Sequence, residues 1–104
     1  MGQAAKCEIS IYLNNGVETP LDLTSKTSIQ QAMLKHYYKT NADAVGEPDI
    51  TVVRCEIFGG SIELELYSSR RANLDFQSGL LDEYLTQTHG DIIDEVTFDT
   101  WVQA

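Results

Sequence analysis

Basic residues are missing from the last third of this chain, in which no lysine or arginine follows Arg71. The same stretch holds seven carboxylates and accounts for most of the net charge of -9 in the 104 residues. The first 71 residues are nearly balanced in charge, because they contain all seven basic residues and nine acidic ones. Such an asymmetry constrains the kind of partner more than it indicates a chemistry.

Cysteines and long apolar runs are also scarce. The two cysteines, Cys7 and Cys55, are too few for a disulfide scaffold, and each lies in a strand pattern where a small buried hydrophobic residue would serve. We expect free thiols that lie about two strands apart, beyond disulfide reach. No apolar run approaches the ~18 residues of a membrane span, and the N-terminus lacks the apolar core of a signal peptide. The sequence predicts one soluble, cytoplasmic domain over residues 1–104, with no membrane partner.

Catalytic and metal-binding signatures are lacking as well. No local motif places a serine or cysteine nucleophile beside a histidine. Gly59-Gly60 lacks the lysine of a phosphate loop and is typical of a hairpin turn. The stretch from His89 to Glu95 matches neither calcium nor zinc spacing and is typical of a solvated turn. We therefore expect no catalytic residue, no metal and no cofactor.

Alternation of apolar and polar residues predicts an opening hairpin. Residues 7–13 and 17–23 each carry apolar side chains at every second position, and Asn14-Asn15-Gly16 between them suits a three-residue turn. This register pairs Leu13 with Val17 and Cys7 with Leu23, which puts the apolar residues on one face. Pro20 cannot donate a ladder hydrogen bond and marks the second strand as an edge.

Two helices and three further strands are predicted after this hairpin. A helix begins with the capping-box spacing at Thr27 to Gln30 and buries Ile29, Met33 and Tyr37. A hairpin over residues 53–66 turns at Gly59-Gly60 and pairs Ile57 with Ile62 and Val53 with Leu66. A second helix runs from near Asn73 to Gly90, and a last strand contains Val96, Phe98 and Trp101. The order ββαββαβ predicts an α+β domain with both helices on one face of a five-stranded, largely antiparallel sheet.

Two stretches carry a resemblance to a known fold. The opening hairpin continues into Asp22-Leu23-Thr24-Ser25-Lys26-Thr27-Ser28-Ile29-Gln30, and a later strand reads Arg54-Cys55-Glu56-Ile57-Phe58-Gly59-Gly60. Both resemble ubiquitin-like β-grasp domains over about residues 7–66. The resemblance implies that fold and no conjugation chemistry, because the chain ends without a Gly-Gly tail. A ferredoxin-like βαββαβ sandwich with residues 17–23 as an added edge strand fits the same pattern.

The open face of the sheet is the strongest candidate site. The predicted registers direct five large side chains outward, namely Tyr12, Val52, Phe58, Tyr67 and Trp101. Several aromatic residues on one open sheet favour a protein interface. Glu56 lies opposite Glu63 in the predicted register, and a basic group from a partner or an adjacent strand would relieve that pair. Single-stranded nucleic acid is excluded as a partner because the face is acidic.

These patterns leave three function classes open. The leading hypothesis is a non-enzymatic interaction module that binds itself, as a homo-oligomer, or a protein partner through the open face. The alternative is an inhibitor or immunity-type protein whose acidic last third masks the basic site of a nucleic-acid-handling enzyme. The acidic surface of that alternative consists of Asp82, Glu83, Asp91, Asp94, Glu95 and Asp99. A third hypothesis is an enzyme that uses His36 or His89, which requires a pocket with a convergent polar cluster.

Arg70 and Arg71 are expected to neutralise nearby carboxylates.

Overall fold

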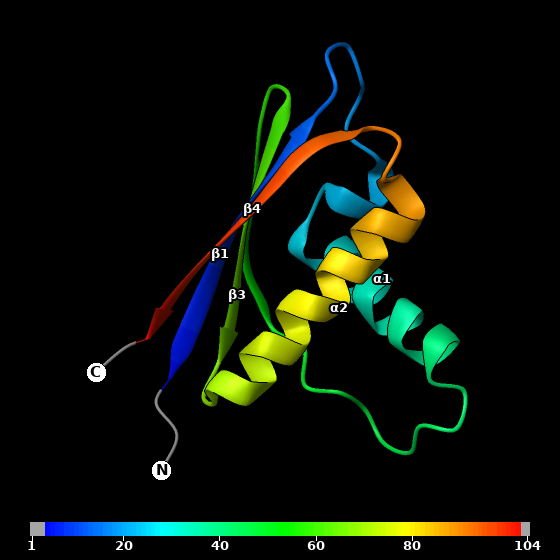
Figure 1. Cartoon of the computed structure of the whole chain (residues 1–104), viewed down its shortest axis with the longest axis vertical. Coiled ribbons are helices and arrows are strands. Elements are labelled where there is room, and N and C mark those ends of the chain that lie inside the picture. The colour runs from blue at the N-terminus through cyan, green and yellow to red at the C-terminus, as the bar shows by residue number, and fades with distance from the viewer. Residues whose placement is uncertain (1–3, 103–104) are drawn as a thin grey trace.

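Two helices cover one face of a four-stranded antiparallel sheet. A computed structural model describes residues 4–102. The elements follow in the order β1 (Ala5–Leu13), the short 3₁₀ helix η1 (Leu21–Leu23), α1 (Lys26–Thr40), β2 (Val52–Phe58), β3 (Ser61–Ser68), α2 (Arg71–His89) and β4 (Ile93–Val102). Figure 1 shows α1 and α2 on the same side of the sheet. No element within residues 4–102 covers the other side.

Strand β1 lies in the middle of the sheet, whose order is β2-β3-β1-β4. Ile9 pairs with Leu64 of β3 on one edge and with Phe98 of β4 on the other. Both hydrogen-bonding edges of β1 are therefore occupied, and no edge is left for residues 17–23. The predicted opening hairpin and its Pro20 edge strand are wrong. Gly16 instead has a positive φ of 84°, and the chain turns away from the sheet into η1.

The topology is that of a ferredoxin-like sandwich. Elements in the order βαββαβ form one antiparallel sheet with β1 and β3 at its centre and β2 and β4 at its edges. The α+β class with both helices on one face is confirmed, and so is the ferredoxin-like alternative. The sheet has four strands rather than five. The resemblance to ubiquitin-like β-grasp domains is wrong, because the hairpin on which it depended does not form.

The helices pack their apolar stripes against the inner face of the sheet. In α1, Ser25 is the N-cap, and its side chain and that of Ser28 each accept a hydrogen bond from the backbone N–H of the other. The cap therefore lies two residues earlier than the spacing at Thr27 had indicated. Ile29 and Met33 of α1 meet Leu74, Leu81 and Leu85 of α2 in one core cluster with the inner residues of β1 and β3. Both cysteines are free, as expected.

A bulge near the start of β2 reverses the predicted orientations of Val52 and Val53. Ile57 pairs with Ile62, as predicted, but Leu66 pairs with Val52 rather than with the predicted Val53, and the register shifts before Arg54. Val52 is consequently buried at 6% exposure, whereas Val53 is 39% exposed. Val52 was wrongly assigned to the open face. The period-two pattern could not reveal this, because an extra residue in a strand inverts every side chain beyond it.

The buried side chain of Gln77 in α2 supports the bulged end of the sheet. Its Oε1 accepts a hydrogen bond from the Thr51 backbone N–H at 2.8 Å, and its Nε2 donates to the Tyr67 carbonyl at 2.9 Å. These bonds satisfy backbone groups that the irregular ladder leaves unpaired. Within residues 4–102, neither α1 nor α2 contains the long apolar stretch that a membrane-spanning helix requires.

The bulge can be tested with a matched pair of substitutions. Val52→Ala should lower the free energy of unfolding by about 2 kcal/mol, because it removes buried methyl groups and leaves a cavity. Val53→Ala should change it by less than about 0.5 kcal/mol, because that side chain is exposed. Urea unfolding monitored by circular dichroism measures both values. Equal losses, or a larger loss at Val53, would contradict the bulged register.

Candidate functional site

Four rows of side chains run across the open face of the sheet. The outer two rows carry the aromatic residues: Tyr67, Lys6 and Trp101 at one end, and Phe58, Ser61, Tyr12 and Glu95 at the other. Tyr12, Phe58, Tyr67 and Trp101 are between 37 and 57% exposed. The predicted face therefore keeps four of its five members, but they form two separate groups at opposite ends of the sheet.

The two middle rows carry a cluster of carboxylates that we call the acidic belt. Glu8 of β1 pairs directly with Glu65 of β3 and with Asp99 of β4. Glu56 pairs with Glu63 in the next row, as the sequence predicted. Like charges placed directly opposite one another on adjacent strands are destabilising. The acidic belt consists of Glu8, Glu56, Glu63, Glu65 and Asp99.

Neighbouring groups within the sheet compensate the acidic belt only in part. The Lys6 ammonium is shared by Glu8 at 3.6 Å and Glu65 at 3.4 Å, and Arg54 lies 3.5 Å from Glu56. The Ser10 hydroxyl donates a hydrogen bond to Glu63 at 2.5 Å. Two cations for five carboxylates leave a surface of negative potential over the two central strands and their neighbours.

The carboxylates of the last third do not form one surface. Asp82 and Glu83 lie on α2, while Asp91 and Asp94 lie at the entry to β4. Glu95 and Asp99 face outward from the sheet, since they pair with Tyr12 and Glu8. The structure thus divides the six predicted acidic residues between the helical layer and the open face, and it joins Asp99 to four glutamates from earlier in the chain.

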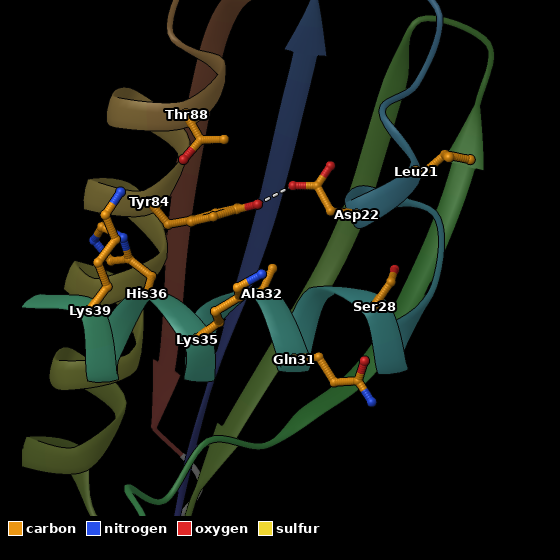
Figure 2. A pocket seen from close by; sticks show the side chains of 10 residues that line it. All are labelled: Leu21, Asp22, Ser28, Gln31, Ala32, Lys35, His36, Lys39, Tyr84 and Thr88. Atoms are coloured by element: carbon orange, nitrogen blue, oxygen red, sulfur yellow. Dashed lines mark hydrogen bonds between the residues drawn. The ribbon is translucent and has the colours of Figure 1, made fainter.

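A second candidate site is a groove of about 530 Å³ beside α1. Figure 2 shows the residues that line it, which belong to α1, to α2 (Tyr84 and Thr88) and to η1 (Leu21 and Asp22). His36, which the sequence had offered as an enzymatic candidate, lies at its edge. No local pattern indicates that residues 21–22 and 84–89 lie close together, because more than sixty residues separate them along the chain.

Asp22 is the centre of a polar network that joins η1 to the end of α2. Its Oδ2 accepts a hydrogen bond from the Tyr84 hydroxyl and contacts His89 Nε2 at 2.7 Å. Burial alone would raise the pKa of Asp22, but these hydrogen bonds and the charge of His89 outweigh it and hold the pKa below its usual value. Burial and the neighbouring Asp22 raise the pKa of Tyr84 far above its ordinary range.

The chemistry of this network favours a structural role over acid–base catalysis. A general acid or base works best when its pKa lies near the working pH, and Asp22 and Tyr84 are shifted away from neutrality in opposite directions. His36 is buried and its Nε2 is engaged by Glu83 at 3.0 Å. Burial likewise raises the pKa of the Cys55 thiol, which therefore stays protonated at neutral pH.

The remaining sequence candidates are also placed by side-chain contacts. Arg71 pairs with Asp75 at 3.1 Å, as expected for a neutralising residue, while Arg70 is the N-cap of α2 and has no ion pair with a described residue. No three potential metal ligands gather within residues 4–102.

Comparison with known proteins supports the fold alone. No family model matches the chain, and no curated protein matches it in sequence. Among solved structures, protein SO0527 from Shewanella oneidensis aligns with a TM-score of 0.53 at 14% identity, covering 99% of this chain and 93% of that chain. PA3566 from Pseudomonas aeruginosa aligns with a TM-score of 0.52 at 9% identity, covering 100% of this chain and 97% of that chain. A dimeric protein of unknown function and ferredoxin-like fold from Bacteroides fragilis aligns with a TM-score of 0.46 at 12% identity, covering 96% of each chain.

The Asp22 network predicts a specific dependence of stability on acidity. Because its folded-state pKa is lowered, Asp22 stabilises the fold above its ordinary pKa of 3.8, and this contribution is lost as the pH falls through the folded-state value. Wild type should therefore be more stable than Asp22→Asn at about pH 5. The difference between their free energies of unfolding should shrink as the pH is lowered. Urea unfolding at a series of pH values measures it.

Asp43→Asn serves as the control for this experiment. Asp43 is an exposed loop carboxylate with no hydrogen bond or ion pair to the described part of the chain. Its substitution should leave the acid side of the stability profile unchanged. A gap between wild type and Asp22→Asn that stays constant or widens below pH 3.8 would show that the carboxylate is not held in its charged form.

Proposed function

We propose that this protein is a non-enzymatic interaction module whose open sheet face binds a positively charged segment of a protein partner. The observation that carries this proposal is the row Glu65-Glu8-Asp99, in which three carboxylates from adjacent strands lie side by side. Such a row lowers the stability of the isolated domain. Arginine or lysine side chains of a partner would relieve the repulsion and would bind with charge-assisted hydrogen bonds.

The arrangement of aromatic residues fits the same kind of partner. Tyr67 and Trp101 border the acidic belt at one end, and Tyr12 and Phe58 border it at the other. Exposed aromatic rings supply apolar contact area and bind cationic side chains through their faces. A partner segment with alternating basic and apolar residues would engage both features.

Self-association through the same face is less favourable by charge. Two copies packed face to face would bring one acidic belt against another, and burial of unpaired carboxylates is costly. A cationic partner avoids this cost. Light scattering coupled to size exclusion distinguishes the two cases, because a dimer formed through this face should appear only when high salt screens the carboxylates or acid neutralises them.

The proposal is tested by titrating the protein with a hexa-arginine peptide. Binding should weaken steeply as salt is raised, and Glu8→Gln/Glu65→Gln should reduce the affinity by about tenfold, because it removes two central charges of the acidic belt. Asp82→Asn/Asp91→Asn is the matched control, since it removes two charges of the alternative acidic surface. It should change the affinity by less than about twofold.

Equal losses in the two double variants would show that the peptide responds to net charge alone and would refute a site on the sheet. A selective loss in the control variant would favour the inhibitor hypothesis instead, with its surface on the last third of the chain. Tyr67→Ser and Trp101→Ser separate the aromatic contribution when the probe is a peptide of alternating arginine and leucine. With that probe the aromatic contribution should persist at high salt because apolar contacts are not screened.

A further inference from the structure

The groove beside α1 contains positive charge that the rest of the protein does not use. Lys35 and Lys39 both line it, four residues apart on one face of the helix. Neither has an ion pair with a described residue, and the same holds for Lys26 and Arg70, whereas Lys6, Arg54 and Arg71 each have one. In a chain of net charge -9, the groove therefore brings together two of the four basic residues that have no ion pair within the described part of the chain.

The groove also exposes apolar surface next to these lysines. Leu21 of η1 lines the groove and is 87% exposed, and Ala32 of α1 lines it as well. Figure 2 shows Lys35 and Lys39 on α1 and Asp22 on η1, so that charged groups border the cavity on two sides, while Leu21 lies beyond Asp22 with its side chain pointing outward. The volume of about 530 Å³ falls in the usual range for small-molecule sites.

The polar groups that line the groove restrict the chemistry of its ligand. Gln31 and Thr88 make no side-chain hydrogen bond to a described residue and are available as donors, as are the two ammonium groups. Asp22, by contrast, is a carboxylate on the opposite side and would repel a second anionic group. A ligand with one anionic head group and an apolar body satisfies both conditions, with the head group at the lysines and the body along Leu21 and Ala32.

From these observations we infer that the groove between α1, η1 and α2 is a binding site for a small organic anion with a single head group, a carboxylate or a phosphate, held by Lys35 and Lys39. The site is independent of the acidic belt, because the helices that form it cover the opposite face of the sheet (Figure 1). Asp22, Tyr84 and His89 act here as positioning residues, since their network holds η1 against α2 and so fixes the mouth of the groove.

The inference is tested with 1-naphthoate as the probe and its neutral analogue 1-naphthalenemethanol as the comparison. Amide chemical shifts in a ¹⁵N-labelled sample should move for residues 31–39 and 84–88 on addition of naphthoate. The neutral analogue should bind about tenfold more weakly, which is the effect expected of one lost charge-assisted contact. Inorganic phosphate tests whether the head group alone suffices, and it should bind more weakly than naphthoate.

Substitutions locate the interaction within the groove. Lys35→Gln/Lys39→Gln should abolish the preference for naphthoate over the neutral analogue, whereas Lys26→Gln, on the same helix but outside the groove, should keep it. Leu21→Ser should weaken both aromatic probes because it removes apolar surface at the mouth. Hexa-arginine binding at the sheet should be unchanged in these variants, so that failure of one site does not imply failure of the other.

Three outcomes would overturn the inference. They are equal affinity for naphthoate and the neutral analogue, chemical-shift changes spread over the surface rather than confined to the groove, and an unchanged preference in Lys35→Gln/Lys39→Gln. The unliganded amide spectrum of each variant verifies that the fold is intact before the titration.

Discussion

The pairing of β1 with a strand on each of its edges is the constraint on which the rest of the structure depends. Because β3 and β4 take both edges, the residues that follow β1 must leave the sheet. They cross to the helical layer, where η1 places Leu23 in the core and Asp22 within reach of Tyr84 and His89. The groove exists only because this segment is not a strand. The rows of the open face are likewise set by the register of β1, since its outward residues align those of β3 and β4.

Local patterns predicted the elements whose partners are near in sequence and failed where the partners are distant. The β2–β3 hairpin is closed by Gly59 with a positive φ of 57°, and its pairing of Ile57 with Ile62 followed from turn chemistry and alternation. The alternation in β1 is equally compatible with an edge hairpin and with a central strand. Only the competition between residues 17–23 and β4 for the same edge decides between them, and that competition is a tertiary effect.

The candidate sites were predictable to a similar extent. Alternation alone placed Tyr12, Phe58, Tyr67 and Trp101 on the open face, and it placed Glu56 opposite Glu63. It failed at Val52, where Gln77 of a distant helix accepts a hydrogen bond from the neighbouring backbone and supports the bulge. The acidic belt could not be recognised from the acidic last third, because four of its five members precede Ala72. The groove lies between three elements that are far apart in sequence, so no motif could have indicated it.

The two surfaces differ in how firmly their geometry is held. The acidic belt is built on paired strands whose backbone hydrogen bonds fix the position of each residue relative to its neighbours, so a partner that bound there would meet a site that is already organised. The mouth of the groove depends on side-chain contacts of a three-residue 3₁₀ helix and on the network at Asp22. Segments with few backbone hydrogen bonds open at lower free energy than the core of a sheet. A ligand that bridges α1 and η1 would therefore stabilise this segment by binding only its folded form, whereas a partner on the acidic belt would act chiefly by removing charge repulsion.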